Sequence, residues 1–339
     1  MSSDLMTGKP AESIWARMSR SPWFGFAVRR AGSLLTSVLV LVVVTFLIVQ
    51  LIPGDPALAV AGADATAADI ERVRTELGLD LSIWQQFVNY VGGLLTGDLG
   101  NSFTWGVSVS SVLAARLPFT VSIALVAMAL MLVIAVPLGM AVSVLTRGGR
   151  RKTVDLVFGV VTGFLSSVPG YVIATLLVVL FAIVFRVLPP AYSAQSGLAS
   201  YPLPIIALAI GPACTIARVV RREMSAVLEQ DYIRTARGWR LRPARVYLRY
   251  ALPNLLTTTL TLSGLILAGM FGGAIVIESV FAWPGLGSGV VAAILNRDYP
   301  VIQGIVLVIG LLATVVNLVV DLALALIDPR SLGGNNDGL

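Results

Sequence analysis

The sequence predicts an all-α membrane protein that crosses the bilayer six times, and two observations support this fold class. Of its 339 residues, 57% are hydrophobic and only 12% are charged, with a mean hydropathy of +0.88. Soluble domains carry about 25% charged residues, so this chain has too little polar surface to stay in water. Its apolar residues also gather into separate runs, each long enough to cross about 30 Å of hydrocarbon as a helix.

The predicted spans follow each other along the chain. The first is an uncharged apolar stretch of 19 residues, which is sufficient for one crossing. The third is longer than one crossing needs, so we expect it to tilt or to kink at Pro169. The six spans are residues 34–52, 118–144, 154–185, 204–220, 255–280 and 302–327.

A secretory signal peptide is the alternative for residues 34–52, because Ala59-Val60-Ala61 resembles a small-residue cleavage site. The apolar run is longer than the 7–15 residues of a signal core. We therefore expect this segment to remain as a membrane anchor.

The basic residues predict the orientation. With residues 1–30 and 331–339 in the cytoplasm, 19 of the 24 Lys and Arg residues lie inside, nine of them between Arg218 and Arg249. The positive-inside rule therefore favours cytoplasmic N- and C-termini. The same distribution explains a pI near 9.8 without nucleic acid, because the Arg residues lie beside apolar segments.

The composition also restricts the chemistry. The chain has no His and a single Cys, Cys214, which excludes disulfides within the chain and the common His/Cys metal sites. Arg151-Lys152-Thr153 lacks the Gly of a phosphate-binding loop. No Gly-x-Ser-x-Gly motif occurs either, so a membrane-embedded enzyme has few catalytic candidates.

Residues 53–117 form a long external loop that carries seven acidic residues and three Arg. Apolar residues recur in it at helical spacing, first at Ile70, Val73 and Leu77 and then from Ile83 to Leu95. We expect two amphipathic helices here. They provide either a docking surface or only a cap on the bundle.

Residues 221–253 form an internal loop much longer than a connection needs. Met224, Val227, Leu228, Tyr232 and Ile233 give one apolar face among charged residues. Such a helix binds a partner protein or lies at the lipid headgroups. The interrupting acidic residues favour a protein partner, and a basic loop that only orients the chain is the simplest alternative.

Several motifs occur in order along the chain. The internal loop contains Asp231-Tyr232-Ile233-Arg234-Thr235-Ala236-Arg237, followed by Leu252-Pro253. Around it lie Ile52-Pro53-Gly54-Asp55-Pro56, Gly97-Asp98-Leu99-Gly100, Glu278-Ser279-Val280-Phe281 with Pro284-Gly285-Leu286-Gly287, and Asn317-Leu318-Val319-Val320-Asp321. With these motifs, the region from about Phe26 to Arg330 resembles the permease subunits of bacterial binding-protein-dependent ABC importers, in their peptide/nickel subfamily.

The resemblance implies a type I ABC importer permease fold in the cytoplasmic membrane, surrounded by lipid. It also implies a second homologous permease, two ABC ATPase subunits and an extracytoplasmic substrate-binding protein. ATP and Mg²⁺ would then be bound by the ATPases, and this chain would carry no cofactor and no catalytic group. The transported solute would be a di- or oligopeptide, a nickel chelate, glutathione or a related small solute.

The resemblance also assigns site residues. The internal loop would couple the chain to an ATPase through Glu229, Asp231, Tyr232, Ile233, Arg234, Thr235, Ala236, Gly238, Arg240, Tyr250, Leu252 and Pro253. Relatives usually read Ala-Lys-Gly where this chain has Gly238-Trp239-Arg240. A Gly in the Arg240 position permits a sharp turn with positive φ, which Arg resists. The alternative is that Gly238 makes this turn two residues earlier.

Gate or translocation candidates are Glu278, Phe281, Pro284, Gly285 and Asp321. A carboxylate inside a membrane is a functional candidate because its unpaired burial is costly. Glu278 either lines an outer gate or holds the turn that follows it, whereas Asp321 is expected to form a structural pair. The second reading of the whole chain is a stand-alone secondary transporter, but the sequence shows no internal repeat of the kind such proteins carry.

Overall fold

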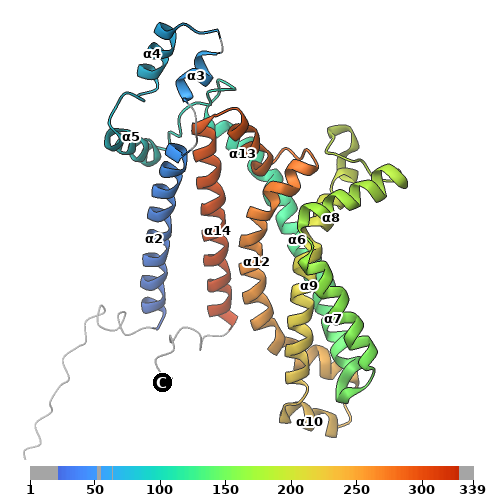
Figure 1. The fold of residues 1–339 in the computed structure, drawn as a ribbon. Helices are drawn as coiled ribbons and strands as arrows, with labels where there is room; N and C mark the ends of the chain where they lie inside the picture. The colour runs from blue at the N-terminus through green and yellow to red at the C-terminus, as the bar shows by residue number, and fades with distance from the viewer. Residues whose placement is uncertain (1–21, 52–54, 63, 328–339) are drawn as a thin grey trace, which may run out of the picture.

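The computed structural model describes residues 22–51, 55–62 and 64–327. No β-strand occurs among these residues, which form a bundle of long helices with a smaller group, α3 to α5, at one end (Figure 1). We call the two ends of the bundle the α4 end and the α10 end. Residues 1–21 of the predicted segment 1–30, the predicted tail 331–339, and Ile52, Pro53 and Gly54 of the first motif lie outside the described residues.

The α-helices are α2 (Pro22–Leu51), α3 (Pro56–Ala61), α4 (Ala67–Glu76), α5 (Ile83–Thr96), α6 (Val109–Thr146), α7 (Lys152–Ser167), α8 (Gly170–Leu177), α9 (Pro202–Val227), α10 (Asp231–Gly238), α11 (Pro243–Arg245), α12 (Leu252–Val280), α13 (Leu286–Leu295) and α14 (Tyr299–Ile327). Two 3₁₀ segments, η1 (Arg147–Gly149) and η3 (Ala194–Ser200), and two π-helical segments, η2 (Val178–Val184) and η4 (Val246–Ala251), connect them.

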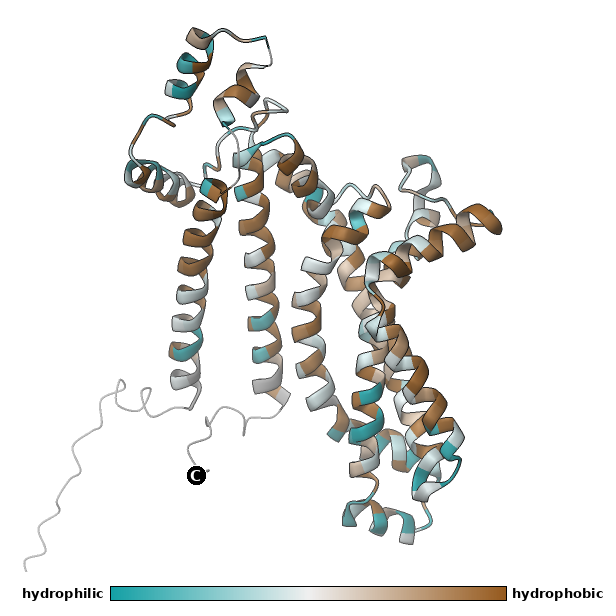
Figure 2. Ribbon diagram, viewed as in Figure 1, coloured by the Kyte–Doolittle hydropathy of each residue, from teal (hydrophilic) through white to brown (hydrophobic). Residues whose placement is uncertain are grey.

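Five helices in the described part of the chain are long and apolar enough to cross a membrane, and they contain most of α2, α6, α9, α12 and α14. A sixth crossing is possible in the third apolar segment, where Lys152–Ser167 and Gly170–Val184 are bent by 97°. Figure 2 shows apolar residues along these helices and hydrophilic ones near α4 and α10.

The bend has a local cause at Val168 and Pro169. Pro169 has no N–H to continue the helix and disfavours the helical conformation of the residue before it. Val168 is accordingly extended, with φ −75° and ψ 127°. The kink expected at Pro169 is therefore present.

The core lies where α9 packs along α6, the most extensive helix pair of the molecule. Ala124, Ala127 and Ala217 are fully buried in it. A Cβ atom on Gly139 of α6 would lie 2.5 Å from the carbonyl oxygen of Ala217. These small residues let the two backbones approach closely, as is usual between helices in membranes.

The two amphipathic helices expected in the external loop are present as α4 and α5. Thr66 caps α4, and its hydrogen bonds hold the pKa of Asp69 below the ordinary value. The ring of Phe87 in α5 packs edge-on against Phe46 of α2, with centroids 5.2 Å apart. Thus α5 rests on the end of α2.

Candidate coupling and gate sites

Helix α10 is short and strongly amphipathic, and it lies at the tip of the bundle (Figure 1). Asp231 in its first turn and Arg237 in its last complement the helix dipole. Ile233 and Ala236, three residues apart, are buried at 0% and 2% exposure. Tyr232 is 42% exposed and lies at the edge of this buried face, because it is four residues before Ala236. One face of the helix therefore packs against the bundle, and the other face is exposed at the surface of the chain.

The buried face of α10 is joined to the membrane helices. Ile233 belongs to the same buried cluster as Met224 and Leu228 of the preceding segment and Val246 of η4. The π-helical segment η4 continues directly into α12, where Leu252 begins the helix. Pro253 is tolerated there because the first turn of a helix has no intrahelical partner for its N–H.

The turn after α10 is made at Arg240. Arg240 has φ 55°, in the left-handed region that favours glycine, whereas Gly238 is the last residue of the α10 helix. The alternative that Gly238 makes the turn is therefore wrong. The backbone keeps the geometry that a glycine would adopt, at a cost of about 1–2 kcal/mol for a residue with a side chain.

The outward face of α10 and its turn form what we call the coupling surface. Its exposed residues are Glu229, Gln230, Asp231, Tyr232, Arg234, Thr235, Gly238, Trp239 and Arg240. Trp239 was not among the predicted site residues, yet it is 69% exposed. Tyr250 is only half-buried and lies in η4, where its carbonyl accepts a hydrogen bond from the Asn254 side chain (2.8 Å).

Glu278 lies at the other end of α12 and is completely buried. Its carboxylate accepts hydrogen bonds from the Thr120 hydroxyl (2.6 Å) and from the backbone N–H groups of Gly287 (2.6 Å) and Ser288 (3.1 Å). Thr120 in turn accepts from the N–H of Leu286 (2.8 Å). Glu278 and Thr120 together satisfy the first three N–H groups of α13.

The glycines of the Pro284-Gly285-Leu286-Gly287 motif permit this arrangement. A Cβ atom on Gly285 would lie 2.3 Å from a Glu278 carboxylate oxygen, and one on Gly287 would lie 2.3 Å from the Cα of Ile275. Arg116 of α6 adds a hydrogen bond to the carbonyl of Gly285 (3.1 Å). We call Glu278, Thr120, Arg116 and the start of α13 the latch, because they join α6, α12 and α13.

Beside the latch lies an aromatic cluster. Phe281 is 2% exposed, and Trp283 is fully buried among the rings of Phe119, Tyr192 and Tyr201. The predicted gate residues Glu278, Phe281, Pro284 and Gly285 thus come together in one place. Sequence reasoning missed Thr120 and Arg116, whose only signal is a polar side chain near the start of an apolar span.

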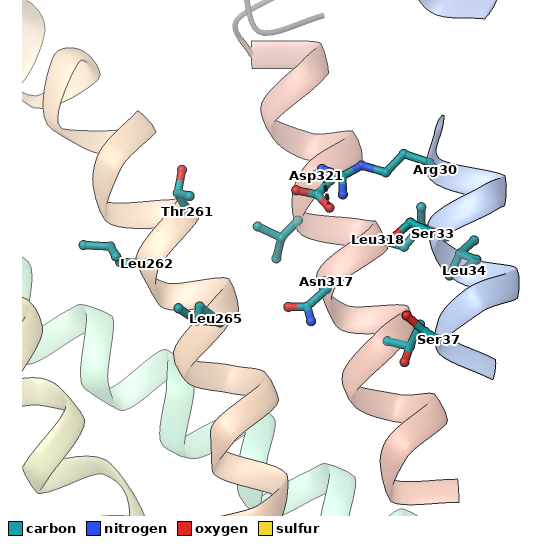
Figure 3. Close-up of a pocket in the computed structure, with 12 residues that line it drawn as sticks. Arg30, Ser33, Leu34, Ser37, Thr261, Leu262, Leu265, Asn317, Leu318 and Asp321 are labelled. Carbon is teal, nitrogen blue, oxygen red and sulfur yellow. Dashed lines mark ion pairs between the residues drawn. The ribbon is translucent and has the colours of Figure 1, made fainter. Parts of the chain in front are cut away.

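Asp321 is remote from the latch. It forms an ion pair with Arg30 of α2 (2.6 Å), at the α10 end of α14 (Figure 3). Both residues line a cavity of about 390 Å³ together with Ser33, Ser37 and Asn317. Asp321 therefore has the ionic partner expected of a structural residue, and it holds α2 against α14.

A further buried carboxylate, Asp298, was not predicted as a site residue. It accepts hydrogen bonds from the Ser102 hydroxyl and from the N–H groups of Phe103 and Thr104 (3.1 Å each). It thereby fixes the loop before α6 to the connection between α13 and α14. Its partners lie almost 200 positions away, so no local pattern indicates them.

The described residues thus form a multi-pass bundle of apolar helices with an amphipathic helix, α10, at its tip. Comparisons with known proteins give the family, which is that of the membrane permease subunits of ABC importers. Residues 135–332 match the model of the binding-protein-dependent transport system inner membrane component, and residues 23–124 match the N-terminal model of such membrane components. The chain belongs to this family and is an inner-membrane protein.

Its relatives include a putative peptide transport system permease protein of Brucella abortus, 38% identical over 89% of this chain and 97% of the relative. The glutathione transport system permease protein GsiC of Pectobacterium atrosepticum is 36% identical over 90% of this chain and 97% of that protein. Among solved structures, the inward-facing MetNI methionine ABC transporter has a similar fold, with a TM-score of 0.54 and 18% identity over 65% of this chain and 97% of the other.

Proposed function

We propose that this chain, with a second homologous permease, forms the path by which an ABC importer moves peptides or related small solutes into the cell. Two ATPase subunits that bind ATP and Mg²⁺ would drive it, and an extracytoplasmic protein would deliver the solute. This chain would bind neither cofactor and carry no catalytic group. The relatives named for peptide and glutathione transport support the solute class.

The coupling surface is the observation that carries the proposal. A groove in an ATPase subunit would receive the exposed face of α10, with Tyr232 as an anchor and the surrounding charges fixing orientation. Because Ile233 is embedded in the core and η4 runs into α12, a displacement of α10 would move α12. The other end of α12 carries Glu278, so a displacement of α12 would also move the latch.

The two neighbouring residues Tyr232 and Ile233 separate docking from folding. Tyr232→Ala removes an exposed ring, so the chain should fold normally, while co-purification of the ATPase falls about tenfold or more. Ile233→Ala creates a cavity in the core and should cost about 2–5 kcal/mol of stability. The measurements are ATPase co-purification, solute-stimulated ATP hydrolysis in reconstituted membranes, and thermal unfolding.

Thr96→Ala serves as a control, because it removes only an exposed hydroxyl that bonds within α5, away from the coupling surface. If Tyr232→Ala retains full co-purification and full stimulation, the coupling role of α10 is wrong. If Tyr232→Ala and Ile233→Ala lower thermal stability equally, the division of α10 into a docking face and a core face is wrong.

A further inference from the structure

A hollow of about 510 Å³ opens between the bend before α8, the middle of α9 and the second half of α12. It includes neither the coupling surface nor the latch. Its walls carry Tyr171, Leu208, Pro212 and Met270, and none of the described residues that line it is charged. Gly211 and Gly269 leave it open, because a Cβ atom on either would meet nothing within 4 Å.

The hollow lies at membrane depth. Gly269 is about 25 Å from the start of α12 and about 17 Å from its end, at 1.5 Å per residue. Pro212 is likewise about 15 Å from the start of α9. Both positions fall inside the roughly 30 Å of hydrocarbon that these helices cross.

Two backbone irregularities meet at this hollow. The break at Val168 and Pro169 interrupts the backbone hydrogen bonding between α7 and α8, and Val168 lines the hollow. Pro212 has no N–H to donate to the carbonyl of Leu208, which lines it too. At membrane depth such irregular backbone is tolerated only where protein buries it or where it borders a water-filled cavity. An open hollow bordered by both breaks is therefore expected to hold water and not lipid.

We propose that this hollow is the part of the solute path that contacts the apolar side chains of a transported peptide. This rests on the proposed function and names the contact surface within it. Backbone carbonyls freed by the breaks offer acceptors for peptide N–H groups, and Tyr171 and Met270 offer apolar contact. None of the described lining residues is charged, and the Arg218 guanidinium donates a hydrogen bond to the hydroxyl of Ser166 in the lining (3.0 Å).

Cysteine labelling tests whether the hollow is wet. In a Cys214→Ala background within the reconstituted complex, Gly269→Cys should react with a charged, water-soluble methanethiosulfonate at least tenfold faster than Gly272→Cys. Gly272 is a matched control on the same helix, exposed and free of neighbours within 4 Å but outside the lining of the hollow. Equal rates at the two positions would overturn the proposal.

A substitution that fills the hollow tests whether the transported peptide contacts its walls. Gly269→Leu extends into open space, so the chain should fold and the complex should assemble as before. Uptake of a tripeptide with a central Phe should fall at least tenfold, while uptake of trialanine stays within twofold of the unmodified complex. Tyr171→Ala, at an exposed position, should also lower uptake of the Phe peptide selectively.

Unchanged uptake of both peptides by Gly269→Leu, or an equal loss of both, would overturn the proposal. A failure of the proposed function gives a different result. In that case the unmodified complex takes up neither peptide in the presence of ATP and binding protein, although the Gly269→Cys variant is still labelled from water.

Discussion

At the scale of single residues, Arg240 has a side chain in a turn conformation that is best suited to glycine. Its positive φ is the conformation that a glycine adopts most easily. The side chain is exposed, and no ion pair of Arg240 among the described residues offsets the cost of the positive φ. Arg240→Gly should therefore stabilise the turn by up to about 1 kcal/mol and leave coupling intact.

The measurement is hydrogen exchange at the amides of residues 239–241, together with solute-stimulated ATP hydrolysis. Arg240→Ala is the control, because it removes the charge and keeps the strained φ. A loss of stimulation in both variants would show that the guanidinium has a partner on the ATPase, contrary to this expectation.

At Glu278, replacing one carboxylate oxygen by an amide nitrogen should change the stability of the latch. Its two carboxylate oxygens accept three hydrogen bonds, and a glutamine amide keeps only one accepting oxygen. Glu278→Gln should therefore leave at least one buried donor unsatisfied and destabilise the latch by about 1–3 kcal/mol. If the latch serves the outer gate, uptake should fall while the ATPase still co-purifies. Uptake at the normal rate would assign Glu278 a structural role alone.

At the scale of elements, the contact between α6 and α9 should be sensitive to a single methyl group. A Cβ on Gly139 would lie 2.5 Å from the carbonyl oxygen of Ala217, which is backbone and cannot swing aside. Gly139→Ala should therefore cost about 1–3 kcal/mol through overpacking. Gly159→Ala on α7 is the matched control, since its Cβ would meet nothing within 4 Å. Thermal unfolding in detergent measures both, and equal unfolding temperatures would contradict the packing argument.

Elements are also the scale at which the sequence was most informative. Apolar length predicts the spanning helices, and Pro169 predicts the break in the third apolar segment, because both effects are local. The amphipathic period likewise predicts α4, α5 and α10. Among the coupling residues, periodicity alone does not separate Ile233, which the bundle buries, from Tyr232, which remains exposed.

The parts that the sequence did not predict are contacts between distant segments. Glu278 meets Thr120 across 158 positions, and Asp298 meets Ser102 across 196. Both carboxylates are buried only because α13 folds back between α6, α12 and α14, and no local pattern describes that placement. The latch thus follows from the fold, whereas the coupling surface follows from a motif.

At the scale of the whole molecule, the distribution of charge should decide how the bundle sits in the membrane. The α10 end carries most of the Arg residues, whereas α4 and the acidic connections around α3, α4 and α5 lie at the opposite end (Figure 1). Retention of basic residues on the cytoplasmic side would therefore place α10 inside the cell and α4 outside. This orientation is also required if α10 is to meet an ATPase in the cytoplasm.

Labelling of single cysteines in a Cys214→Ala background of intact cells tests the orientation. Cys214 is buried, so its replacement should leave the surface unchanged. Asp64→Cys and Ala194→Cys, both at exposed positions toward the α4 end, should react with a maleimide that cannot cross the membrane. Arg150→Cys, exposed in the connection between α6 and α7, should react only after the membrane is opened. Labelling of Arg150→Cys in intact cells would show that the chain has the opposite orientation in the membrane. In that orientation α10 would lie outside the cell, where it could not bind a cytoplasmic ATPase.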